Sequence, residues 1–177
     1  MREIFLLAMA LQGVFGVDVD YATELADAAI DVGQEFDIRP AVLLSLGWHE
    51  GRLLANPRRR GHKWSKQHPS SICSMFQLTG GRYGIAPCEV LVKDWKLAMR
   101  QAAELKLAVF RRHCGKDYVR AYNAGYAGCC SGPYWRKHKD DPDRRWVCHS
   151  TFPDKVFRDA DRLEKEVLRV ARKHPKN

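Results

Sequence analysis

The sequence predicts a single, mainly helical domain with long loops. Four segments, near residues 21–36, 40–50, 94–109 and 154–170, carry apolar residues at the three- and four-residue spacing of a helix face. No segment shows the sustained two-residue alternation of a strand, although the loops leave room for a short hairpin. The chain has 177 residues, a length typical of one domain with a substantial core.

The N-terminal segment, residues 1–17, has two interpretations. Residues 4–11 are an apolar run in which Ala8 and Ala10 are spaced like a cleavage signal, as in a secretory signal segment. The only positive charge before this run is Arg2, which stands beside Glu3. An extra N-terminal helix of the mature fold is therefore an equal alternative.

Helix boundaries are marked by capping residues. Asp20 is placed to cap the segment that follows it, and Asp94 stands where the third helix begins. Pro40 fits the first position of the second helix, where a missing N–H costs nothing. Asp117 caps a short helix that is expected to stop at Gly125. We assign the apolar stripe of the third helix to packing.

The C-terminal part, residues 137–177, divides into loop and helix. Residues 126–152 are rich in glycine, proline and aromatic residues and carry three of the cysteines, so this loop is expected to be tied to the body of the domain. From Asp154 onward the apolar spacing predicts a final amphipathic helix with a heavily charged outer face.

Six cysteines indicate disulfides and an oxidising compartment. Cys129 and Cys130 are adjacent, so they are expected to have different partners. Free buried thiols are the alternative, because cysteine often behaves as a small apolar residue. A zinc site would draw on His113, Cys114, Cys130, Cys148 and His149. No C-x-x-C pair is present, so we expect no metal and no cofactor.

The net charge of +9 favours an anionic partner, and nucleic acid, an anionic membrane or the bacterial cell wall would all qualify. Nucleic acid is not expected, because the densest basic run, residues 58–60, falls in an aperiodic loop instead of a recognition helix. No run of eighteen apolar residues exists, so no integral membrane span is expected either. We expect a monomer.

Glu50 is the main catalytic candidate. It ends the apolar face of the 40–50 helix, which runs through Leu43 and Leu46. A carboxylate on an apolar face tends to keep its proton, because burying its charge is expensive. A protonated carboxyl near neutral pH is what a general acid requires. The alternative is a helix-end glutamate that emerges into solvent, since Gly51 indicates that the helix is ending.

Two further motifs follow Glu50: Ser74-Met-Phe-Gln77 and Ala121-Tyr-Asn-Ala-Gly125. In this order, the three signals resemble the lytic transglycosylases of the bacterial wall, which share the lysozyme-like fold of goose-type lysozyme. The resemblance covers residues 22–136. It implies a lysozyme-like helical domain that acts on peptidoglycan strands in the periplasm, in the cell envelope or outside the cell, and that a bacterium or a phage could encode.

The resemblance also implies roles for individual residues. Glu50 matches the single catalytic acid/base, and Gln77 matches a glutamine that contacts substrate. Tyr122 matches a groove residue whose hydroxyl lies near the catalytic carboxyl. The remaining positions implied to bind substrate are Met75, Thr79, Ala121 and Asn123.

The sequence departs from the family pattern at three places. The serine that follows the glutamate is Gly51 here, which removes a hydroxyl expected near the substrate's acetamido group. The usual G-L-M-Q reads Ser74-Met-Phe-Gln77, and the following methionine-proline reads Thr79-Gly80. The chain therefore looks like a divergent member.

The chemistry implied by the resemblance needs one carboxylate. Glu50 would protonate the glycosidic oxygen between N-acetylmuramic acid and N-acetylglucosamine, then accept the proton of the muramic C6 hydroxyl as a 1,6-anhydro ring closes. One alternative is a goose-type-like muramidase that hydrolyses the same bond with water and a second acid, for which Glu89, Asp94 and Asp117 are available but better explained as caps or surface charges. The other is a catalytically inactive peptidoglycan-binding module.

Overall fold

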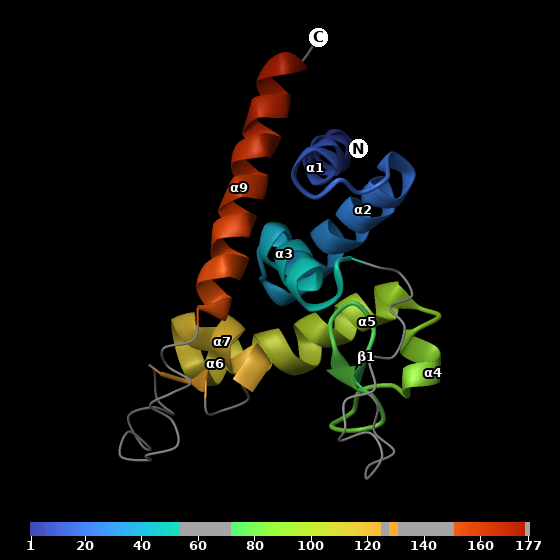
Figure 1. Ribbon diagram of the computed structural model, residues 1–177, viewed down its shortest axis with the longest axis vertical. Helices are drawn as coiled ribbons and strands as arrows, with labels where there is room; N and C mark the ends of the chain where they lie inside the picture. Colours follow the sequence, from blue (N-terminus) through green and yellow to red (C-terminus); the bar gives the residue numbers. More distant parts are fainter. Residues whose placement is uncertain (54–71, 125–127, 131–150, 176–177) are drawn as a thin grey trace.

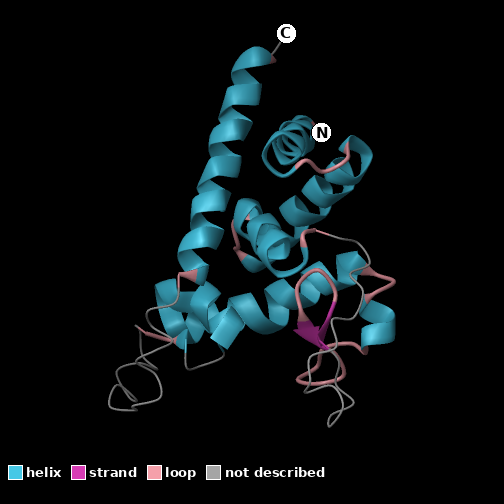
Figure 2. Cartoon of the chain, viewed as in Figure 1, coloured by secondary structure: helices cyan, strands magenta, loops and turns pink. Residues whose placement is uncertain are grey.

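The computed structural model describes residues 1–53, 72–124, 128–130 and 151–175, and these are mainly helical, as predicted. The expected short hairpin is also present (Figures 1 and 2). In chain order the elements are α1 (Arg2–Phe15), α2 (Val19–Phe36), α3 (Pro40–Gly51), β1 (Ile72–Cys73), β2 (Leu78–Thr79), α4 (Cys88–Leu91), α5 (Trp95–Ala102), the π-helical segment η2 (Ala103–Leu107), α6 (Ala108–Cys114), the short 3-10 segment η3 (Gly115–Asp117), α7 (Tyr118–Ala124) and α9 (Phe152–Lys173).

The central element is α3. Figure 1 shows it between α1, α2 and α9 on one side and the α5–α7 run on the other. Every residue from Ala41 to Gly47 is buried, so the helix is buried on all faces of its first two turns and not only along the predicted stripe. Pro40 occupies the first turn, as predicted. The C-cap is Arg52 in the left-handed region, whose N–H bonds back to the carbonyls of Gly47 and Trp48.

The N-terminal segment is a helix that packs on α2 and α9, with Leu7 and Leu11 buried. Its first residues meet the end of α9, where Arg2 donates to the carbonyl of His174 at 3.1 Å. Within the described ranges, no helix has the length and apolar character that crossing a bilayer requires.

Helix α9 begins at Phe152, two residues before the predicted start, with Pro153 in its first turn. Its outer face is charged, as expected, and two of its carboxylates, Asp161 and Glu164, bond to Arg39 at 2.7 and 2.8 Å. These exposed pairs tie the start of α3 to α9 and stabilise the fold little, because water screens them.

The cap of α2 was assigned to the wrong residue. The helix begins at Val19, so Asp18 is the N-cap, and its carboxylate accepts hydrogen bonds from the backbone N–H groups of Asp20 and Tyr21. The prediction for Asp94 is confirmed, since its carboxylate accepts from the N–H of Leu97 at 2.9 Å.

The long third helix is present as α5, η2 and α6 in succession, so the predicted helix is confirmed and continues to Cys114. Its middle is the π-helical turn Ala103–Leu107. Such turns insert one extra residue into a helix and are frequent at functional sites.

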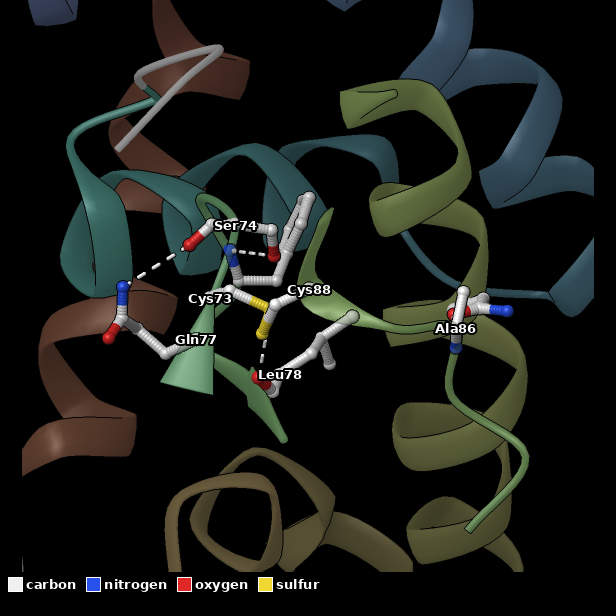
Figure 3. The surroundings of a disulfide bond; sticks show 8 residues. Cys73, Ser74, Gln77, Leu78, Ala86 and Cys88 are labelled. Atoms are coloured by element: carbon white, nitrogen blue, oxygen red, sulfur yellow. Dashed lines mark hydrogen bonds between the residues drawn. A yellow bond between two sulfur atoms is a disulfide. The ribbon is translucent and has the colours of Figure 1, made fainter. Parts of the chain in front are cut away.

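Two disulfides are formed among the described residues. Cys73–Cys88 joins the hairpin to the start of α4 (Figure 3), and Cys114–Cys129 joins the end of α6 to the chain beyond α7. Cys130 is also disulfide-bonded, so Cys129 and Cys130 have different partners, as predicted. Disulfides of this kind persist in oxidising compartments. With its sulfur in a disulfide, Cys114 is not available as a zinc ligand.

Candidate active site

A pocket of about 480 Å³ lies between the chain that follows β2 and the η2–α6–α7 segment. Its apolar wall is formed by Ile85, Leu105, Val109 and Phe110. The polar or aromatic residues on it are Thr79, Tyr83, Lys106, Tyr122 and Asn123. A mostly apolar cavity of this size with a few polar groups is typical of a site for a small ligand.

Glu50 lies next to this pocket, at the C-terminal end of α3. Its side chain is partly buried and accepts a hydrogen bond from the amide of Asn123, which lines the pocket. Desolvation raises the pKa of Glu50, while the Asn123 bond and the charge of Lys106 act in the opposite direction, and desolvation is the largest of the three effects. The carboxyl therefore has the environment of a general acid, unlike a glutamate that emerges freely into solvent.

Tyr122 connects the pocket to the hairpin. It is buried, and its hydroxyl donates to the carbonyl of Phe76 at 2.6 Å. Burial first, and then the charge of Glu50, raises the pKa of Tyr122 well above its ordinary value, so the phenol stays neutral. The ammonium of Lys106 lies 4.2 Å from the centre of its ring.

The hairpin turn is packed directly on the end of α3. A Cβ atom at Gly51 would lie 2.6 Å from the Cα of Met75 and 2.7 Å from its carbonyl oxygen. One turn earlier, a Cβ at Gly47 would lie 3.3 Å from the ring of Phe76. This close approach leaves no room for a side chain at position 51, where this chain has glycine.

The turn itself holds two non-glycine residues at positive φ, Ser74 at 66° and Gln77 at 50°. The Ser74 hydroxyl accepts from the N–H of Phe76, and the Gln77 amide donates to the carbonyl of Ser74, each at 3.2 Å (Figure 3). Unusual backbone of this kind persists where surrounding contacts fix it, and it often marks a functional site.

The predicted site residues fall into two groups. Glu50, Thr79, Tyr122 and Asn123 lie in or beside the pocket. Gln77 is half-buried with its amide directed to Ser74, and it is not one of the residues that line the cavity.

Met75 and Ala121 are fully buried and pack in the interior, so neither side chain has surface to offer a ligand in this structure. Gly125 of the third motif lies outside the described residues.

The sequence missed part of the pocket. Leu105 and Val109 belong to the stripe that is assigned to packing, and both also line the cavity. Leu105 packs against the hydrophobic core as well, so it has both roles. Lys106 was not singled out at all. A lysine beside an apolar stripe normally lies at the solvent boundary. Only knowledge of the π turn could have indicated that Lys106 lines a pocket.

The three candidate second acids are placed elsewhere. Asp94 caps α5, Asp117 accepts a hydrogen bond from Arg120 at 2.6 Å, and Glu89 is exposed on α4. None of them lines the pocket. Among the residues described, no three His, Cys, Asp or Glu side chains gather in a way that could hold a metal ion.

The sequence matches no protein-family model, and comparisons with characterised proteins and with solved structures also gave no match. The function therefore has to be argued from the chemistry of the site itself.

Proposed function

We propose that this protein is a peptidoglycan lytic transglycosylase of lysozyme-like fold that cleaves the β-1,4 bond between N-acetylmuramic acid and N-acetylglucosamine, with Glu50 as the single acid/base. The observation that carries the proposal is the partly buried Glu50 carboxyl, held by Asn123 beside a pocket that has no carboxylate among the described residues that line it. The series of motifs around Glu50, Gln77 and Tyr122 supports the same reading.

In the proposed reaction, protonated Glu50 donates its proton to the glycosidic oxygen as the bond to the muramic C1 breaks. The Glu50 carboxylate then accepts the proton of the muramic C6 hydroxyl, whose oxygen attacks C1 and closes the 1,6-anhydro ring. No water is consumed, and Glu50 ends the cycle protonated, as it began.

The residues around Glu50 suit both steps. Desolvation favours the protonated form that begins the reaction, whereas the Asn123 amide and the Lys106 charge favour the carboxylate that forms midway. A carboxyl under these opposing influences can alternate between donor and acceptor at moderate cost.

The compartment and the charge of the chain agree with this substrate. The disulfides favour an oxidising environment, and peptidoglycan lies in the periplasm or outside the cell. The net charge of +9 favours contact with a wall that carries peptide carboxylates.

The deciding experiment is mass spectrometry of the muropeptides that the protein releases from purified peptidoglycan. We expect products that end in 1,6-anhydro-muramic acid, one water lighter than reducing-end products. Reducing ends would instead establish the goose-type-like muramidase. No release by folded protein would favour the inactive binding module.

The hydrogen bond from Asn123 gives a prediction for the pH dependence. Because this bond lowers the pKa of Glu50, Asn123→Ala is expected to raise that pKa further. The acid step requires protonated Glu50, so activity falls as pH rises through its pKa, and in the variant this fall is expected at higher pH. The profile of kcat/KM against pH on solubilised glycan strands measures the shift. A fall at unchanged or lower pH would contradict the assigned role of the bond.

A further inference from the structure

Lys106 places a full positive charge in the pocket. Of the described residues that line the cavity, it is the one with a basic or acidic side chain, and four others are apolar. Its side chain is partly buried, and desolvation lowers the pKa of its ammonium group. A cation in such surroundings is costly to the fold, so its presence calls for a compensating function.

The charge has no close anionic partner within the described part of the chain. No carboxylate oxygen in that part lies within 4.0 Å of the Lys106 Nζ, which is the distance limit of an ion pair. The Nζ instead lies over the ring of Tyr122, 4.2 Å from its centre. Glu50 acts on it only through longer-range attraction, and this attraction disappears when Glu50 carries the proton that begins the reaction. In that state the cation in the pocket faces no anion from the described part of the chain.

The backbone holds Lys106 in this position. The residue lies in the π-helical turn Ala103–Leu107, between α5 and α6, and both it and its neighbour Leu105 line the cavity. The ring beneath the ammonium is fixed in turn, because the Tyr122 hydroxyl is bonded to the carbonyl of Phe76. The ammonium of Lys106 is thus fixed by a helical backbone and by the ring of Tyr122. A cation held in this way is better suited to bind a ligand than the ammonium of a mobile surface lysine.

We propose that Lys106 binds a carboxylate of the glycan, and that the pocket thereby prefers muramic-acid-containing strands to neutral glycans. This inference rests on the proposed function and adds the recognition element to the same site. N-acetylmuramic acid carries a lactyl group, which ends in a free carboxylate when the strand is bare and continues into a peptide with its own carboxylates when it is not. A partly desolvated ammonium attracts either anion more strongly than a solvated one would.

The test uses the Glu50→Gln variant, which is expected to leave glycan strands uncleaved. Its residue 50 is uncharged, as Glu50 is when it is protonated. Binding is titrated with three soluble ligands of equal length: peptide-free muramic strands, peptide-bearing strands and chitin oligosaccharides. We expect tighter binding of the anionic strands than of chitin, and an approximately tenfold loss of affinity for those strands on Lys106→Met. Chitin binding is expected to stay unchanged, and Lys106→Arg is expected to retain part of the preference.

Lys96→Met is the matched control. Lys96 also lies over an aromatic ring, that of Trp95 at 5.4 Å, but it is exposed and lies outside the pocket. This change is expected to leave all three affinities as they are. If Lys106→Met does not fold, Lys106→Gln removes the same charge with a polar side chain.

The results with the three ligands distinguish the ways in which the inference can fail. Loss of affinity for peptide-bearing strands alone would assign the carboxylate to the peptide, and loss for bare strands alone would assign it to the lactyl group. Loss for both would show that the ammonium of Lys106 binds either anion. An equal loss for chitin, or no loss for the anionic strands, would overturn the inference while muropeptide release still supported the enzyme. Absence of glycan binding together with absence of release would overturn the proposed function itself.

Discussion

Glu50→Gln is expected to reduce lysis of purified peptidoglycan by at least about 10³-fold while the protein stays folded. Glutamine has nearly the same shape and its carbonyl can still accept the hydrogen bond from Asn123, but it can neither donate nor accept the proton in either step. The fold does not depend on the charge, because burial already disfavours the ionised form of Glu50. Loss of turbidity in a peptidoglycan suspension measures lysis, and circular dichroism measures the fold.

Glu104→Gln is the matched control for this variant. Glu104 is an exposed glutamate in the same π-helical turn as Lys106, so its replacement removes one negative charge without touching the pocket. Lysis by this control is expected to equal that of the wild-type protein. Wild-type lysis by a folded Glu50→Gln protein would refute the single-carboxylate assignment.

Gly51→Ser is expected to destabilise the protein, although it introduces the serine found at this position in the family that the sequence resembles. The new Cβ would meet the Cα, carbonyl carbon and carbonyl oxygen of Met75 at 2.6 to 2.9 Å, and these backbone atoms cannot swing aside as a side chain would. Overpacking of this kind costs about 3 kcal/mol, at the upper end of its usual range. The midpoint of urea unfolding measures the loss, and we expect lysis to fall as well because the hairpin moves away from Glu50.

Gly13→Ser provides the comparison. Gly13 lies within α1, where a Cβ would meet only the carboxylate end of Glu166 at 3.3 Å, and that side chain can move. The same chemical change is therefore expected to leave the unfolding midpoint nearly unchanged. Equal stability of the two serine variants would show that the hairpin does not depend on the close approach at Gly51.

Periodicity predicted the helices well, because apolar spacing reports which residues a helix buries. It was less informative about α3, whose residues Ala41 to Gly47 are all buried. A helix in the centre of a domain has no solvent face, so the predicted stripe was only part of its buried surface. The cap of α2 was placed two residues late for a different reason, since Asp18 and Asp20 are both good capping residues and spacing alone does not distinguish them.

The site was predicted in outline only. Tyr122 and Asn123 were singled out through the resemblance of their short motif, and Glu50 also through its place on an apolar helix face; the structure brings the three residues together. Lys106 and the wall at Leu105 could not be found from the sequence, because their place in the pocket depends on the π turn and on packing between distant segments. The reason for glycine at position 51 was likewise not visible in the sequence, since it lies in a contact with Met75, which is distant in the chain.

The hairpin is attached to three separate parts of the chain: to α4 through the Cys73–Cys88 disulfide, to α3 through the contact at Gly51, and to α7 through the hydroxyl of Tyr122. The last of these joins residues 46 positions apart in sequence. Contacts of such long range form late in folding, because loop closure must precede them. The chain is thus expected to acquire its helices before its pocket, and a chain that ends before α7 would have the glutamate without the surroundings that make it an acid.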